Sequence, residues 1–305
     1  MRFVRCLCLP LLIAFCTTFL PLLGVAQQKS GNEHIPGRTA SQNAVSASPM
    51  LTQKITRRES QRFGYGGTVS IVGAPHGSIA IEGWQRNEVE VVADIELQAT
   101  TEEDLKRLST VNGFLFDEDL NHVRILTTGT HDRAFMRRAA KDFPKKLLSL
   151  PWKIDYRLRV PVASDVEIDA GRGPIKFVGV EGALRVAATE SGTNLVLTGG
   201  TVNAVVAAGT VNVRIPVRSW RGGGAEIRLA SGSLVVELPA GFNGDIDAEI
   251  LRTGSIEDAT GGLEKRERPG ITERQVKARS GAGGAYFHFV VGDGTITFKK
   301  LVVSD

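Results

Sequence analysis

The feature that most constrains this sequence is a short repeat that recurs along most of the chain. Each unit is a glycine, an apolar residue two positions later and, in nearly every unit, a second apolar residue two positions after that. Successive units are often nine or ten positions apart. The units begin at Gly67, Gly77, Gly173, Gly182, Gly200, Gly209, Gly232, Gly244, Gly254 and Gly294. Between residues 200 and 215 the tetrapeptide Gly-Thr-Val-Asn occurs twice, nine positions apart.

This spacing predicts short β-strands joined by tight turns. Apolar side chains two positions apart lie on one face of a strand, and glycine takes the positive φ of a turn without steric cost. A strand and a turn of this size cannot bury an apolar face alone, whereas stacked copies can. The sequence therefore predicts an all-β, right-handed, β-helix-like solenoid of short strands. Its inward side chains are expected to include Val202, Ala204, Val206, Val211, Val213 and Ile215.

The glycine spacing also predicts the size of one coil. The interval from Gly173 to Gly200 equals the interval from Gly182 to Gly209, and each is three steps of nine. Three strand-turn units in each coil would place these glycines above one another. The alternative is an antiparallel β-sandwich made of hairpins, in which Asp293-Gly294 forms a hairpin turn.

The N-terminal segment 1–26 has the layout of a secretory signal peptide. Arg2 and Arg5 precede an apolar run, and Gly24 and Ala26 are the small residues expected before a cleavage site. The mature chain is predicted to begin near Gln27, and retention of the segment as a membrane anchor is the alternative. Residues 27–60 are predicted to be a disordered tether, because the polar, small-residue composition of 27–50 cannot form a packed core. The β-repeat domain is then expected to cover 61–305.

Cysteine usage and charge exclude several classes of function. Cys6, Cys8 and Cys16 all lie in the predicted signal peptide. A chain that starts at Gln27 therefore has no disulfide, no thiol chemistry and no thiolate metal site. The net charge of +4 falls to +2 when Arg2 and Arg5 are removed, so charge gives no indication of nucleic-acid binding.

One short helix is expected among the strands of the N-terminal half. Alternating strands at 67–72, 77–82 and 88–98 are followed by residues 104–111, which fit a helix that Thr101 can cap. Two more strands are expected near 113–117 and 122–127.

A basic insertion at about 129–154 interrupts the strand pattern. Phe135, Ala139, Phe143, Leu147 and Leu150 would form one stripe of a helix, although Pro144 breaks or kinks it. The segment either binds an anionic lipid or polysaccharide surface, or covers an open end of the β-stack. The candidate contacts to an anionic surface are Arg133, Arg137, Arg138, Lys141, Lys145 and Lys146.

The repeat resembles that of the Toastrack-type bacterial putative adhesin family. The resemblance covers roughly residues 65–300, from GSIAIEGW at 77–84 to GDGTITFKK at 292–300. Its most specific line is matched by Val160, Pro161, Val166, Ile168, Gly171, Gly173, Ile175, Phe177, Gly179, Val180 and Gly182. The resemblance implies a right-handed, β-helix-like fold in an exported or envelope-associated protein. The family supplies no catalytic residues, and the insertion at 129–154 and the segment 261–280 are longer than its usual connections.

The sequence contains no recognisable catalytic or cofactor motif. A phosphate-binding loop, a dinucleotide fingerprint, a nucleophile elbow and paired metal-ligand histidines are all missing. Asp117-Glu118-Asp119 is predicted to form a solvated turn, with a calcium site as the alternative. Asp245 and Asp247 project from one strand and are the carboxylates that a polysaccharide-processing enzyme on this fold would use.

These observations predict a non-enzymatic exported protein of the bacterial periplasm or cell surface. It would act as a putative adhesin or interaction scaffold without a cofactor, because the outward faces of a β-stack offer a long binding surface. Its partner is expected to be an envelope protein or a polysaccharide, with an anionic membrane surface as a further partner for 133–153 and no nucleic acid. The alternatives are a polysaccharide-processing enzyme and an envelope-stress-related sensory domain.

Overall fold

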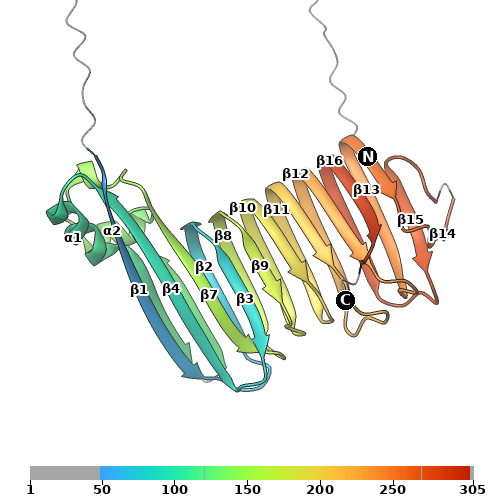
Figure 1. Ribbon diagram of the computed structural model, residues 1–305, viewed down its shortest axis with the longest axis horizontal. Helices are drawn as coiled ribbons and strands as arrows, with labels where there is room; N and C mark the ends of the chain where they lie inside the picture. The colour runs from blue at the N-terminus through green and yellow to red at the C-terminus, as the bar shows by residue number, and fades with distance from the viewer. Residues whose placement is uncertain (1–48, 120, 269, 303–305) are drawn as a thin grey trace, which may run out of the picture. The chain divides into compact units, whose positions relative to one another are not determined.

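The computed structural model describes residues 49–119, 121–268 and 270–302 (Figure 1). The chain divides into the units Met1–Ala47 and Ser48–Asp305, and every described residue belongs to the second. The predicted signal peptide and the tether as far as residue 48 therefore lie outside the described residues. In the part that is described, no helix is long and apolar enough to cross a membrane.

The second unit is almost entirely β-structure. Its strands are β1 (Leu51–Arg62), β2 (Thr68–His76), β3 (Ile79–Trp84), β4 (Glu88–Ala99), β5 (Gly113–Asp119), β6 (His122–Thr128), β7 (Trp152–Pro161), β8 (Asp165–Arg172), β9 (Ile175–Val178), β10 (Ala183–Val196), β11 (Thr201–Arg214), β12 (Gly224–Leu238), β13 (Gly244–Asp258), β14 (Leu263–Lys265), β15 (Gln275–Ser280) and β16 (Tyr286–Lys300). Its helices are α1 (Glu102–Val111), α2 (Arg133–Ala139) and the single 3-10 turn η1 (Lys145–Leu147).

The strands form two layers, and five long strands belong to both. The first half of each long strand lies in one layer and the second half in the other; these strands are β10, β11, β12, β16 and β13. The first half of β10 pairs with β8, and its second half pairs with β9. Layer A consists of β5, β6, β2, β8 and the first halves of the long strands, and ends at β15 and β14. Layer B consists of β1, β4, β7, β3, β9 and the second halves. Figure 1 shows the strands side by side in one row from β1 to β14.

One apolar core lies between the layers, as the alternation predicts. Val202, Ala204 and Val206 from the first half of β11 are at most 2% exposed, and so are Val211, Val213 and Ile215. The pairings among β8 to β13 and β16 are parallel, and antiparallel pairs occur only toward the two ends of the row. The solenoid prediction is therefore confirmed over the hairpin sandwich. Asp293-Gly294, expected as a hairpin turn in that alternative, lies inside β16.

One coil contains two repeat units, so the predicted coil of three units is wrong. Val186 of β10 pairs with Ala204 of β11, and Val166 of β8 pairs with Leu184 of β10. In both pairs the partner comes two steps of nine later in the chain. Each coil has one bend within a long strand and one turn between strands. The sequence spacing misleads because a step of nine fits a coil of two units and a coil of three units equally well.

A column of glycines forms the bend between the two layers. Gly209, Gly232, Gly294 and Gly254 lie on neighbouring strands and pair in that order. Their φ values lie between +130° and +142°, a region that side chains with a Cβ rarely adopt. A Cβ on Gly209 would also overlap the carbonyl oxygen of Ser191 on the next strand. The repeated glycines thus permit both the bend and the close approach of adjacent strands.

The last strand of the chain is inserted between two earlier ones. β16 pairs in parallel with β12 on one side and with β13 on the other. It carries the buried side chains Phe287, Phe289 and Phe298 into the core. This order, β12-β16-β13, is not visible in the sequence, because the pattern of β16 is that of the other long strands.

The β unit begins earlier in the chain than the predicted domain boundary at residue 61. β1 begins at Leu51, so residues 51–60 of the predicted tether belong to the β unit. All of β1 pairs with β4, and Arg57 donates from Nη1 to the carbonyl of Phe114 at 2.9 Å. α1 begins two residues before the predicted 104, and Thr101 caps it by accepting from the backbone N–H of Asp104 at 3.1 Å.

Candidate functional site, a basic groove beside the helices

The basic insertion folds into two separate helical pieces. Asp132 caps α2 by accepting hydrogen bonds from the backbone N–H groups of Ala134 and Phe135, at 2.8 and 3.0 Å. α2 ends at Ala139, and η1 begins only after Pro144. The single continuous helix is therefore not formed, because proline cannot continue the hydrogen-bond ladder. Along the predicted stripe, Leu147 is buried whereas Ala139 is exposed.

Three of the six predicted basic residues come together in one groove. Arg133 and Arg137 lie one turn apart on α2, and Lys145 reaches the same groove from η1. Arg138 and Lys141 are exposed outside it. Lys146 points elsewhere and pairs with Asp104, with an Nζ–Oδ2 distance of 3.2 Å. The remaining lining residues are Thr130, His131, Met136, Leu148 and Ser149.

The groove is electropositive. Within the described ranges, no ion pair is found for Arg133, Arg137 or Lys145, and no carboxylate lines the groove. Leu148, 40% exposed, adds an apolar side chain next to these cations. Unpaired cations beside an exposed apolar side chain are what an anionic amphiphilic surface would contact.

Two histidines extend the groove toward the sheet. An adjoining hollow shares Thr130, His131, Leu148 and Ser149 and is also lined by His76 and Trp152. The ring centroids of His131 and Trp152 are 5.4 Å apart. Desolvation, opposed by the nearby Asp132, lowers the pKa of His131. The sequence does not reveal that His76 and His131 line one hollow, since they are far apart in the chain.

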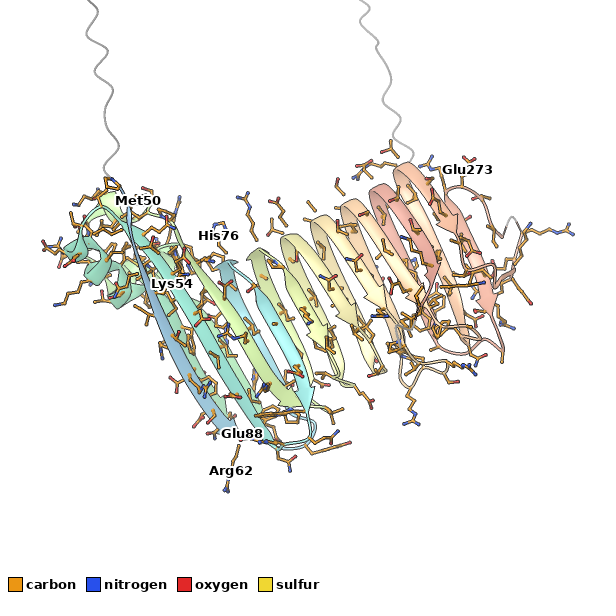
Figure 2. All side chains as sticks on the ribbon, viewed as in Figure 1. Met50, Lys54, Arg62, His76, Glu88 and Glu273 are labelled. Atoms are coloured by element: carbon orange, nitrogen blue, oxygen red, sulfur yellow. The ribbon has the colours of Figure 1, made fainter. Side chains whose placement is uncertain are left out.

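β1 begins at the end of the sheet where β4 leads into α1. Leu51, at the start of β1, pairs with Ala99, the last residue of β4 before α1. The backbone N–H of Gln98 in turn donates to the carbonyl of Pro151, a lining residue of the hollow, at 3.2 Å. Figure 2 shows Met50 and His76 along the same edge of the ribbon. The start of β1 is therefore separated from Pro151 by β4.

The two carboxylates of the enzyme alternative are engaged in ion pairs. Arg279 donates from Nε to Asp245 at 2.8 Å, and Arg266 donates from Nη2 to Asp247 at 2.6 Å. The Tyr286 hydroxyl also donates to Asp247, at 2.9 Å. The hydrogen bond from Arg279 holds the pKa of Asp245 below its ordinary value. A glycosidase needs a carboxylic acid whose pKa is raised, so the electrostatics of Asp245 are opposite to those of a general acid.

This cluster gives a pH prediction for stability. A carboxyl group with a lowered folded-state pKa stabilises the fold above its unfolded pKa and loses that contribution as pH falls through the folded value. We therefore expect Asp245→Asn to destabilise the protein at pH 7 by at most about 1 kcal/mol, as for partly exposed ion pairs. The difference from wild type should shrink from pH 7 to about pH 2, as Asp245 becomes protonated in the folded state. Urea unfolding at both pH values measures it, and a difference that stays as large in acid would contradict the ion-pair interpretation.

One serine–histidine pair invites comparison with a catalytic arrangement. Ser70 Oγ lies 2.9 Å from Nε2 of His122, and it donates to Glu167 at 3.3 Å. In a hydrolytic triad the acid orients the histidine, whereas here Glu167 contacts the serine. Ser70 is 3% exposed. The geometry is that of a hydrogen-bonded cross-strand cluster that joins β2 to β6 and β8.

The acidic segment 117–119, predicted as a solvated turn or a calcium site, lies in a strand. Asp117, Glu118 and Asp119 form the end of β5, paired with β6, rather than a free turn. Among the described residues, no group of three or more His, Cys, Asp or Glu side chains is arranged to hold a metal ion.

Comparison with known proteins gives weak likenesses. No protein-family model matches the chain, and no curated protein matches its sequence. A putative cell adhesion protein from Clostridium sporogenes ATCC 15579 is 12% identical, with a TM-score of 0.34, over 81% of this chain and 100% of that one. A putative adhesin from Bacteroides fragilis NCTC 9343 is 8% identical, with a TM-score of 0.31, over 82% of this chain and 97% of that one. These scores support no inference about this chain, and membership of the Toastrack-type family stays a prediction.

Proposed function

We propose that this chain is a non-enzymatic, exported interaction protein of the bacterial envelope or cell surface. Export is inferred from the layout of residues 1–26. The absence of catalysis is inferred from the ion pairs that occupy Asp245 and Asp247 and from the burial of Ser70. The β-stack serves as a rigid scaffold that presents side chains at its surface.

The basic groove is the docking site of this scaffold, and its partner is an anionic lipid surface. The observation that carries the proposal is the convergence of Arg133, Arg137 and Lys145, without ion pairs within the described ranges, beside the exposed Leu148. Lysines and arginines at an anionic membrane contribute about 1 kcal/mol each.

Vesicle binding tests the proposal. The full chain should sediment with vesicles of phosphatidylglycerol and phosphatidylcholine, and not with phosphatidylcholine alone. The triple variant Arg133→Glu, Arg137→Glu, Lys145→Glu should lose at least about 100-fold in affinity, since three contacts of about 1 kcal/mol are lost. Added salt should weaken the binding of wild type, because screening acts on exposed charges.

The matched control reverses three cations elsewhere on the surface, Arg185, Arg218 and Lys299. It should bind vesicles like the wild type. Equal loss in both triple variants would show that only net charge matters, and binding to neutral vesicles would show that charge is not involved. Either result contradicts docking through the groove.

A further inference from the structure

A second groove lies on the outer face of layer B, away from the helices. It runs over β1, β4, β7, β3 and β9 and has a volume of about 380 Å³, within the range of about 300–1,000 Å³ seen for small-ligand sites. Its walls are the long side chains Arg58, Arg157, Arg159, Lys176, Glu82 and Glu90. It shares no lining residue with the basic groove.

The register of the strands makes a regular row across this groove. Arg58 pairs with Val92, and Val92 with Arg157. Arg157 pairs with Ala80, and Ala80 with Lys176. Long cations therefore alternate with small apolar residues. Because strands lie about 4.8 Å apart, successive cations recur about every 9.6 Å, and the short side chains of Val92 and Ala80 leave hollows between them.

The row continues beyond the groove as amide side chains. Lys176 of β9 pairs with Asn194 of β10, and Asn194 with Asn212 of β11. Asn212 donates from Nδ2 to Oδ1 of Asn194 at 2.9 Å, and both side chains are exposed. Amide groups on a flat outer face can donate to and accept from hydroxyl groups.

The cations of the groove differ in how firmly they are held. Arg157 is paired with Asp94 at 2.8 Å, whereas Arg58 and Arg159 lie 3.5 and 3.7 Å from Glu90. Lys176 has no ion pair within the described part of the chain. Lys176 can therefore take an anionic ligand directly, and Arg58 and Arg159 can turn toward one with little loss.

We propose that this groove binds an acidic oligosaccharide that lies across the strands. Its carboxylate or sulfate groups would contact Lys176, Arg58 and the N–H donors of Arg157 that Asp94 does not use. These cations recur at every second strand, a spacing close to the length of a disaccharide. Its hydroxyl groups would donate to Glu82 and Glu90, and its sugar rings would rest on Ala80 and Val92. The lining presents no ring on which the bases of a nucleic acid could stack.

Binding of hyaluronan oligosaccharides, which carry one carboxylate per disaccharide, tests the proposal with the full chain. Wild type should bind them in a salt-sensitive manner, and dextran, a neutral glycan, should not bind. Ala80→Glu places a carboxylate between Arg157 and Lys176, and Lys176→Glu reverses the unpaired cation. Each should lower the affinity by roughly ten-fold or more. Both positions point outward from strands, and circular dichroism verifies that the variants fold.

Two controls separate this site from others. Arg185→Glu makes the same charge reversal on the outer face of layer A and should leave the affinity unchanged. The triple variant Arg133→Glu, Arg137→Glu, Lys145→Glu should also keep it, whatever happens to vesicle binding. The proposal is overturned if hyaluronan does not bind, if dextran binds equally, or if Ala80→Glu and Lys176→Glu bind like the wild type. Loss in the triple variant alone would assign the glycan to the basic groove and overturn it as well.

Discussion

Replacing Gly209 with valine is expected to lower the free energy of unfolding by about 2–6 kcal/mol, the sum of two effects. Gly209 has a φ of +130°, which a β-branched residue resists, at a strain of about 1–3 kcal/mol. The new side chain would also overlap the carbonyl oxygen of Ser191, and overpacking adds about 1–3 kcal/mol. Backbone strain alone, which is all that the sequence indicates, would give the smaller value. Urea unfolding measures the change.

Gly192 supplies the matched control in the neighbouring coil. Its φ is not in the left-handed region, and a Cβ there would meet no atom within 4 Å. We expect Gly192→Ala to change stability by less than about 1 kcal/mol, and to stabilise if it changes it at all. Equal costs at Gly192 and Gly209 would show that the glycine column does not form the bend.

Replacing Phe289 with aspartate is expected to unfold the C-terminal coils. Phe289 is 1% exposed, and its ring lies 5.8 Å from that of Phe298. Losing a buried phenylalanine costs about 3–5 kcal/mol, and a buried unpaired carboxylate adds to that cost. The sum is comparable with the whole stability of a domain, about 5–15 kcal/mol. Because β16 separates β12 from β13, both neighbours should lose protection of their amides against hydrogen exchange.

Thr295→Asp on the same strand is the control for that experiment. Thr295 is exposed on the outer face, opposite Ser233 and Ser255. We expect the free energy of unfolding of Thr295→Asp to differ from wild type by at most about 0.5 kcal/mol, as for other surface substitutions.

The Phe289→Asp variant also has an outcome that would contradict the account. If the amides of β12 and β13 kept their protection in it, β16 would not be needed to join these two strands.

The fold could be predicted from the sequence where the pattern is local. Alternation within GTVNAVVAAGTVNVRI identifies Val202 and Val211 as inward residues and Asn212 as an outward one, because side-chain direction depends only on the residue's place in its strand. The coil length could not be predicted, since units nine positions apart fit two or three per coil. The position of β16 between β12 and β13 could not be predicted either, because strands that share one periodic pattern do not reveal which of them pair.

The candidate sites, too, could be predicted from the sequence only in part. Composition identifies the basic residues of 133–146, but only the break between Ala139 and Lys145 decides that Arg133, Arg137 and Lys145 share a groove. The row from Arg58 to Lys176 could not be predicted at all. Its members are far apart in the chain and become neighbours only through the register of five strands.

The two-unit coil determines which residues are partners on adjacent strands, so a pair of engineered cysteines tests it most directly. Asn194 and Asn212 are partners on adjacent parallel strands, about 4.8 Å apart, within the Cα separation of about 4.4–6.8 Å that a disulfide requires. Asn194→Cys with Asn212→Cys should therefore form a disulfide on mild oxidation of the folded protein. Peptide mapping by mass spectrometry would distinguish it from bridges to Cys6, Cys8 or Cys16.

The control pair is Arg185→Cys with Asn212→Cys, whose separation in the chain is that of a three-unit coil. It should form no disulfide, because Arg185 lies in layer A and Asn212 in layer B. The two-unit coil predicts a disulfide between positions 194 and 212 and none between 185 and 212. A disulfide between 185 and 212, with none between 194 and 212, would contradict it.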